Sequence, residues 1–405
     1  MGYKKEAMKG VGWVGAFRVV SRGMSFLRTA ILARILSPEQ FGTYGIGLLV
    51  LALLEVFTET GINVFLVQQK GKIDKYVNTS WVISIVRGVL ISLLTLLSIP
   101  LVTSFFREPG AQSILIVISM VPVFRGFINP GIVLFQKDLR FSMDFLLQTA
   151  RFGVDTVVAI MVARATESEL ALAWGLMAGV VTEVVLSHAM VSLRPRLSFD
   201  AKKARQIIGT GKWVTGAGIF DWSSQNADDA VVGRFLGTSS LGFYQMAYKL
   251  STLPIREITQ VVGRVTLPVY VKIANKARLK CAFIKTLASV TLLSGLASVA
   301  IFLFAETLVS VILGPGWEPA VPVVRVLALF GFIRAVIGVF YALFLATKKE
   351  RWVTLVTMVE LVGLLATVVP LTARFGIIGA AYAAIVSAVV TVPFVVYFYT
   401  QSFDE

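Results

Sequence analysis

Charged side chains occur at helical spacing inside apolar segments of this chain. Arg18 and Arg22 stand one helical turn apart, and Ser25 and Thr29 continue the same helical face. An ionisable group in mid-bilayer costs about 2.5–3.5 kcal/mol on insertion scales, so each one needs a partner, water or a function. A guanidinium group is planar and matches phosphate oxygens with paired hydrogen bonds. The pattern predicts that Arg18 and Arg22 contact a phosphate group in a hydrated cleft.

Other charges in apolar segments extend this hypothesis. The further basic residues for which we expect phosphate contacts are Arg125, Lys249, Arg256 and Arg334. The carboxylates for which we expect a role in gating or ion coupling are Glu55, Glu59, Asp221 and Asp228. Glu55, Glu59 and Asn63 follow each other at four-residue steps, which predicts one acidic helix face.

The same charges have an alternative interpretation, in which they neutralise one another. The basic first segment would then pair with the acidic second one, and the acidic segment around Asp221 with the basic one around Arg256. Arg151 and Asp155 are four residues apart and are expected to form an ion pair within one helix. The residues alone leave both interpretations open.

The elements that must position these charges are membrane helices. The chain has 405 residues, of which 56% are hydrophobic and 15% charged, and its mean hydropathy is +0.80. Because about 20 apolar residues cross the roughly 30 Å hydrocarbon layer as a helix, the long continuous segments predict an all-α integral membrane protein. Twelve spans are expected, at 11–36, 44–68, 80–105, 112–136, 143–164, 171–193, 210–236, 242–270, 282–305, 319–346, 352–373 and 376–400.

The net charge of +15 is concentrated in alternate loops. These basic loops lie around 4–9, 70–75, 137–140, 194–205, 272–280 and 348–351. By the positive-inside rule, this alternation places both termini in the cytoplasm, in agreement with an even number of spans. It also argues against nucleic acid as a partner, because the charge follows the membrane topology.

An internal repeat divides the chain. The residues Trp13, Arg34, Leu36, Gly42 and Tyr44 recur 200 positions later as Trp213, Arg234, Leu236, Gly242 and Tyr244. We therefore expect two six-helix lobes, 1–193 and 210–405, joined by a basic cytoplasmic linker at 194–209. Since each lobe has an even number of spans, the repeats should be parallel and related by a pseudo-two-fold axis along the membrane normal. Duplicated membrane halves favour a transporter.

Several classes of site find no support in the sequence. His188 and Cys281 are the only histidine and cysteine, and no metal-ligand spacing, Gly-rich phosphate loop or nucleophile elbow is present. No loop is long enough to fold as a catalytic domain. We expect no enzyme activity, no cofactor and no direct ATP hydrolysis, and a membrane polymerase or ligase is disfavoured.

The run from Arg34 to Tyr44, RILSPEQFGTY, resembles the first-loop motif of bacterial polysaccharide flippases of the Wzx type. These belong to the multidrug/oligosaccharidyl-lipid/polysaccharide exporter superfamily. Further segments that resemble the branch exporting exopolysaccharide, colanic or teichuronic-type units are 61–70, 105–109, 137–141, 242–248, 267–268 and 375–381. The similarity extends over essentially the whole chain.

The resemblance implies a flippase for undecaprenyl-diphosphate-linked oligosaccharide in the bacterial cytoplasmic (inner) membrane. It implies a V-shaped central cavity between the lobes, alternating access, and cationic residues that bind the headgroup. Coupling to H⁺ or Na⁺, a monomeric transport unit and cooperation with a polysaccharide polymerase and export machinery are further expectations. The alternative is a cation-coupled multidrug exporter of the same superfamily, whose cavity should be acidic.

Overall fold

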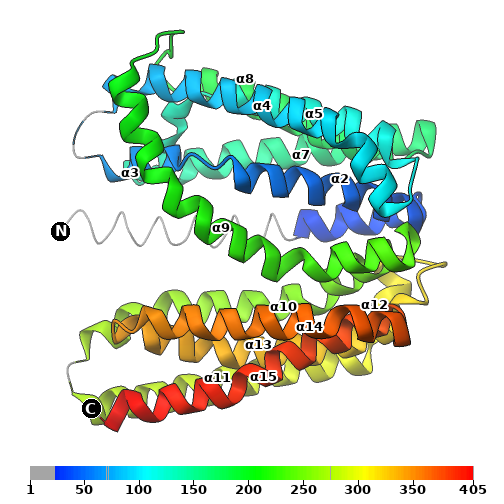
Figure 1. The fold of residues 1–405 in the computed structure, drawn as a ribbon, viewed down its shortest axis with the longest axis vertical. Helices are drawn as coiled ribbons and strands as arrows, with labels where there is room; N and C mark the ends of the chain where they lie inside the picture. The colour runs from blue at the N-terminus through cyan, green and yellow to red at the C-terminus, as the bar shows by residue number, and fades with distance from the viewer. Residues whose placement is uncertain (1–22, 70, 72, 274, 405) are drawn as a thin grey trace. The chain divides into compact units, whose positions relative to one another are not determined.

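The computed structural model describes residues 23–69, 71, 73–273 and 275–404 of the chain. Arg18 and Arg22 therefore lie outside the described residues. The described part is helical and contains no β-strand (Figure 1). Eight of its helices are long and apolar enough to cross a membrane, or nine if one bent pair counts as a single span. The protein is thus a multi-pass, all-α membrane protein.

The chain divides into two compact units, with unit 1 ending at Trp222 and unit 2 beginning at Ser223. A helix over Gly23–Ala33 comes first. The other helices of unit 1 are α2 (Pro38–Phe57), α3 (Ile62–Gln68), α4 (Asp74–Phe106), α5 (Ala111–Gly126), η1 (Pro130–Ile132), α6 (Val133–Lys137), α7 (Phe141–Thr166) and α8 (Leu170–Met190). Helix α9 (Ala201–Leu236) continues from unit 1 into unit 2. The remaining helices of unit 2 are α10 (Thr238–Lys272), α11 (Lys276–Leu303), α12 (Ala305–Ile312), α13 (Ala320–Ala346), α14 (Glu350–Phe375) and α15 (Ile377–Asp404).

Two of the expected continuous spans are broken, and the prediction was wrong at both places. The span expected at 44–68 is divided into α2 and α3, because Gly61 adopts a left-handed conformation with φ 66°. The span expected at 112–136 bends by 70° between α5 and the segment from Pro130 to Lys137. Pro130 begins η1, and the side chain of Asn129 accepts a hydrogen bond from the Gly131 amide at 2.9 Å. A proline that starts a new helix has no amide hydrogen to continue the preceding one.

Two long helices are too polar to count among these candidate spans. Helices α9 and α10 are the least apolar of the long helices, although they coincide with the spans expected at 210–236 and 242–270. Both carry several charged residues, among them Asp228 and Arg256. The count of twelve spans accordingly stays a prediction.

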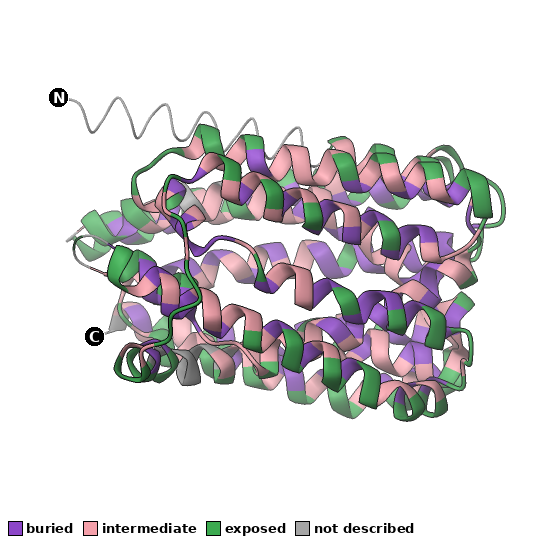
Figure 2. Ribbon diagram, turned by 90° about the horizontal axis from the view of Figure 1, so that it is seen from above, coloured by how far each residue is buried: buried purple, intermediate pink, exposed green. Residues whose placement is uncertain are grey.

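Apolar side chains cover much of the outer surface of the helices. In the most apolar windows of α4 and α11 only 22% of residues are buried within the protein, and Leu97 and Leu101 of α4 are 76% and 69% exposed. Figure 2 shows that exposed and buried positions alternate along the helices. Since exposed apolar surface of this extent is unfavourable in water, it is the surface that meets lipid.

The segment that follows α8 is fixed to unit 1 by its backbone. The amide of Arg196 donates to Asn78 Oδ1 at 2.9 Å, and the carbonyl of Leu193 accepts from Asn129 Nδ2 at 2.7 Å. Asp200 then caps α9, because its carboxylate accepts from the Lys203 and Lys202 amides. The Lys203 amide and ammonium hold the pKa of Asp200 below its ordinary value.

Helices α4 and α5 pack closely through two glycines, and this contact gives a first prediction. A Cβ on Gly88 would lie 2.2 Å from the carbonyl oxygen of Pro122, and a Cβ on Gly126 would lie 2.8 Å from the Ile85 Cα. Because the obstacle is backbone, Gly88→Ala must push the helices apart, and we expect it to lower the unfolding free energy by about 1–3 kcal/mol. Thermal unfolding of purified protein in nanodiscs measures this.

Gly153→Ala serves as the matched control for that variant. Its added Cβ would meet only the end of the Met24 side chain at 3.6 Å, which is ordinary contact. We expect it to leave the unfolding temperature unchanged or to raise it slightly, since alanine favours helix over glycine. Equal unfolding temperatures for the two variants would contradict the close helix contact.

Candidate functional site: two charged pockets

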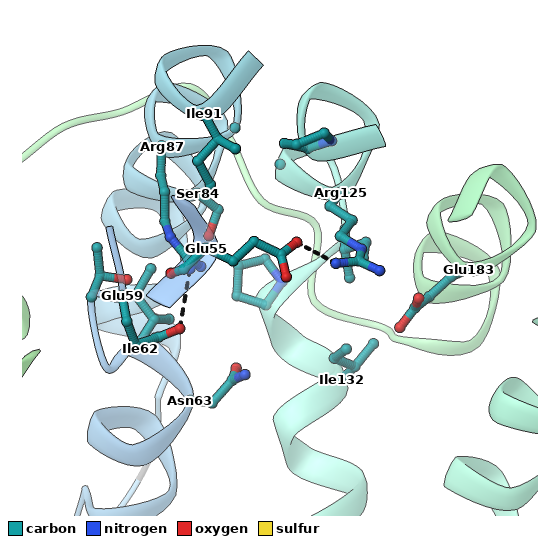
Figure 3. A pocket seen from close by; sticks show the side chains of 16 residues that line it. Glu55, Glu59, Ile62, Asn63, Ser84, Arg87, Ile91, Arg125, Ile132 and Glu183 are labelled. Atoms are coloured by element: carbon teal, nitrogen blue, oxygen red, sulfur yellow. Dashed lines mark hydrogen bonds and ion pairs between the residues drawn. The ribbon is translucent and has the colours of Figure 1, made fainter. Parts of the chain in front are cut away.

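Unit 1 contains a pocket of about 240 Å³ where its two broken spans meet. It is lined from α2, α3, α4, α5, η1 and α8, and we call it the unit 1 pocket. Its ionisable side chains are Glu55, Glu59, Arg87, Arg125 and Glu183 (Figure 3). Three of these, Glu55, Glu59 and Arg125, are predicted from the sequence, and the fold brings them together.

Glu55 and Arg125 form an ion pair across the pocket. Glu55 lies in the last turns of α2 and Arg125 in the last turn of α5, and their side chains point toward each other in Figure 3. The two side chains keep 29% and 32% of their surface exposed, respectively. The two charges therefore neutralise each other, and both side chains remain accessible from the pocket.

Arg87 holds the break between α2 and α3. Its guanidinium donates to the Glu55 carbonyl at 2.7 Å, to Glu59 Oε2 at 3.1 Å and to the Thr58 hydroxyl at 3.3 Å. The other oxygen of Glu59 accepts from the Gly61 amide at 2.9 Å. Arg87 thus donates hydrogen bonds to carbonyl and carboxylate groups at the end of α2, where backbone carbonyls have no partner within the helix. The expected single acidic helix face does not form, because the helix ends between Glu55 and Asn63, yet both residues line the pocket.

The expected ion pair between Arg151 and Asp155 is wrong. Asp155 pairs with Arg28 at 2.9 Å, and Arg151 pairs with Glu183 of α8 at 3.7 Å. Helical spacing within α7 permits the intrahelical pair, but each side chain finds its counter-charge on another helix. The arginine–carboxylate pairs of unit 1 therefore join neighbouring helices.

Unit 2 contains a second pocket, of about 300 Å³, which we call the unit 2 pocket. Arg256 of α10 and Arg334 of α13 line it, as does Glu360 of α14, whose carboxylate lies 3.4 Å from Arg334 Nε. Arg256 donates to the Tyr248 hydroxyl at 2.8 Å, and its guanidinium carbon lies 5.2 Å from the centre of that ring. Among the described residues, no carboxylate lies within ion-pair distance of Arg256. The two predicted arginines of unit 2 thus share one pocket.

The two pockets differ in their balance of charge. At the 200-residue spacing predicted for the repeat, Glu55 and Glu59 correspond to Ile255 and Thr259, and both of these line the unit 2 pocket. Three carboxylates and two arginines line the unit 1 pocket, whereas two arginines and one carboxylate line the unit 2 pocket. The first has a formal excess of negative charge and the second an excess of positive charge.

The remaining predicted residues of unit 2 lie elsewhere. Asp228 is buried and accepts a hydrogen bond from the Tyr244 hydroxyl at 2.6 Å. Lys249 belongs to the lining of neither pocket, and the same holds for Asp221 of unit 1. Arg87, Glu183 and Glu360 are not among the residues predicted from the sequence, although each is an ionisable residue within an apolar span, which is the signal that identifies the others.

Comparison with protein families decides the membership of this chain. A family model described as polysaccharide biosynthesis protein matches residues 31–322. The chain belongs to this family. Two relatives are the lipopolysaccharide biosynthesis protein WzxC of Escherichia coli and the teichuronic acid biosynthesis protein TuaB of Bacillus subtilis. Each is 22% identical to this member of the polysaccharide biosynthesis family. The match with WzxC covers 83% of the chain and 69% of the relative. The match with TuaB covers 82% of the chain and 70% of the relative.

Two solved structures share the fold of this family member. The lipid II flippase MurJ, in an inward closed conformation, matches 96% of this chain and 89% of its own with a TM-score of 0.79 at 13% identity. An inward-facing multidrug transporter of the MATE family matches 94% of each chain with a TM-score of 0.74 at 14% identity. At this level of identity the similarity shows a shared fold.

Proposed function

We propose that the protein is a flippase that moves undecaprenyl-diphosphate-linked oligosaccharide across the bacterial cytoplasmic membrane for polysaccharide biosynthesis. The observation that carries this proposal is the unit 2 pocket, where Arg256 and Arg334 face a single carboxylate in a membrane protein. A diphosphate cannot enter hydrocarbon without losing its hydration, whereas a polar pocket with guanidinium groups replaces the lost water. Membership in the polysaccharide biosynthesis family supports the same class of cargo.

The geometry suits recognition of an anion. A guanidinium group has five N–H donors in a fixed plane, so Arg334 can bind phosphate oxygens while keeping its contact with Glu360. Tyr248 orients Arg256 through its hydroxyl and its ring. Arg125, Lys249, Arg18 and Arg22 stay proposals as additional phosphate contacts.

The unit 1 pocket suits ion coupling better than headgroup binding. Glu55 pairs with Arg125, and Glu59 pairs with Arg87. An approaching anion would therefore have to compete with these carboxylates for the two arginines. We assign to the carboxylates the gating or coupling role, with H⁺ or Na⁺ as the coupled ion, and extend that proposal to Asp221 and Asp228. Transport would then proceed by alternating access, with no enzymatic step and no cofactor.

The wider arrangement follows from the charge pattern and the family. Both termini are proposed to be cytoplasmic, the transport unit monomeric, and a polysaccharide polymerase with its export machinery the consumer of the product. Within unit 1 the Lys137 ammonium donates to the carbonyls of Gln69 and Gly71, so two of the basic loops lie at the same end, as the positive-inside rule requires.

A leaflet assay tests the proposal. Purified protein is reconstituted with undecaprenyl-diphosphate oligosaccharide whose sugar carries a fluorophore, and a membrane-impermeant reductant bleaches the outer leaflet. We expect nearly complete bleaching with the protein and about half in protein-free vesicles. Half-bleaching in both preparations, with and without an imposed ion gradient, would refute the proposed cargo.

The acidic unit 1 pocket and the MATE-like fold keep a second candidate, a cation-coupled multidrug exporter. Such a protein should drive the efflux of lipophilic organic cations from vesicles when a proton or sodium gradient is imposed. Efflux of a cationic dye, together with no movement of the lipid-linked sugar, would select this alternative.

A further inference from the structure

The connection between α8 and α9 exposes large apolar side chains outside the membrane-spanning helices. Leu197 and Phe199 keep 76% and 60% of their surface exposed, and Ile208, in the second turn of α9, keeps 53%. Side chains of this size are rarely left in water when they follow one another so closely. The stretch lies in unit 1, between the end of a membrane span at Met190 and the body of α9.

This exposure is not the result of a loosely held loop. The backbone is fixed at Arg196 by Asn78 and at Asp200 by the Thr79 hydroxyl, at 2.9 and 3.3 Å. Ala204 and Ile207, which follow in α9, are buried against α3 and α4 in a core cluster. The chain therefore holds Leu197 and Phe199 outward on a rigid support.

Basic side chains accompany the apolar ones. Arg196, Lys202 and Arg205 are exposed, whereas the guanidinium of Arg194 turns back to the His188 carbonyl and closes the end of α8. The one acidic residue of the stretch, Asp200, is occupied by Lys203 and the first amides of α9. The outward charge of this stretch is thus positive.

The neighbouring residues mark the level of the membrane surface. The Trp81 indole donates to the Phe127 carbonyl at 3.2 Å, and its ring lies 6.1 Å from that of His188 near the end of α8. Tryptophan is enriched where headgroups meet the hydrocarbon layer. The stretch that begins a few residues after His188 is consequently at the membrane interface.

We propose that residues 196–208 form an interfacial anchor that binds anionic phospholipid headgroups. Leu197, Phe199 and Ile208 enter the boundary between headgroups and acyl chains, and the exposed basic residues contact lipid phosphates. Apolar side chains interleaved with basic ones at this depth are the pattern of interfacial lipid binding. The alternative partner is a soluble acidic protein, which would pair with the basic side chains. It would also have to cover the apolar side chains, which already lie at the bilayer.

Depth-dependent fluorescence tests the anchor in the full-length protein. Cys281, the only cysteine, is replaced by serine, and an environment-sensitive dye is attached at Phe199→Cys. The protein is placed in nanodiscs of phosphatidylcholine with or without phosphatidylglycerol. We expect lipids with a nitroxide near the headgroup to quench the dye, aqueous iodide to be excluded, and both effects to be stronger with phosphatidylglycerol.

Two variants separate the lipid contact from folding. Gln112→Cys, labelled at an exposed site at the start of α5, should show no dependence on phosphatidylglycerol. In the Phe199→Cys protein, the triple change Arg196→Gln, Lys202→Gln and Arg205→Gln should remove that dependence without changing the unfolding temperature. Equal access of iodide in both lipids, protection independent of phosphatidylglycerol, or protection that appears only when a soluble protein is added would overturn the proposal.

Discussion

Replacing Arg256 and Arg334 together with glutamine is expected to abolish translocation of the lipid-linked oligosaccharide. Each guanidinium supplies charge-assisted hydrogen bonds worth about 1.5–3 kcal/mol. Loss of both should therefore weaken headgroup binding by a factor of about 10²–10⁴. The measurement is the initial rate in the leaflet assay, together with binding of the lipid-linked sugar to purified protein.

The control must separate lost binding from lost folding. Arg325→Gln removes an arginine from the same helix, α13, but this residue pairs with Glu306 at 3.0 Å outside the unit 2 pocket, and transport should be unchanged. Arg334→Gln alone leaves Glu360 without its counter-charge and should reduce stability. Adding Glu360→Gln should restore stability without restoring transport. Recovery of transport in that double variant would show that Arg334 has only a structural role.

Arg87→Met is expected to give the largest loss of stability in unit 1. The change removes hydrogen bonds to three acceptors and leaves the carboxylate of Glu59 and the end of α2 unsatisfied. Because the Arg87 and Glu59 side chains are 24% and 36% exposed, the cost should lie near the lower end of the about 3–5 kcal/mol for removing one partner of a buried ion pair. We expect a lower unfolding temperature in nanodiscs and faster proteolysis near the break between α2 and α3.

Two further substitutions make this result interpretable. Arg87→Lys keeps the charge but has one nitrogen in place of a planar fork, so it should recover only part of the stability. Arg107→Gln removes an exposed arginine just after the same helix, α4, and should have no effect. If Arg87→Met unfolds at the same temperature as the unchanged protein, the break does not depend on this side chain.

The sequence predicted the helical membrane fold well because long apolar segments in lipid leave the backbone little alternative. It failed at the breaks near Gly61 and Pro130, where a local backbone conformation interrupts an otherwise apolar pattern. Glycine and proline are common inside membrane helices, so neither residue type by itself distinguishes a break from a continuous span.

The charged pockets were predictable in part. Single ionisable residues in apolar spans identified Glu55, Arg125, Arg256 and Arg334, and the fold distributes them between two pockets. Their partners were not predictable, because a side chain long enough to reach a neighbouring helix has several possible counter-charges. Arg151 shows this, since it pairs with Glu183 rather than with the carboxylate one turn away on its own helix.

The shared helix α9 has a consequence for the history of the molecule. Its first turns, with Ala204 and Ile207, complete the core of unit 1, although by the repeat they stand at the junction with the second copy. If the chain arose by gene duplication and fusion, the earlier copy came to rely on residues at the entrance to the later one. If two halves cut at the old junction were translated separately, the first would lack Ala204 and Ile207 from its core, and the second would carry them without their neighbours, so the fusion would be difficult for evolution to reverse.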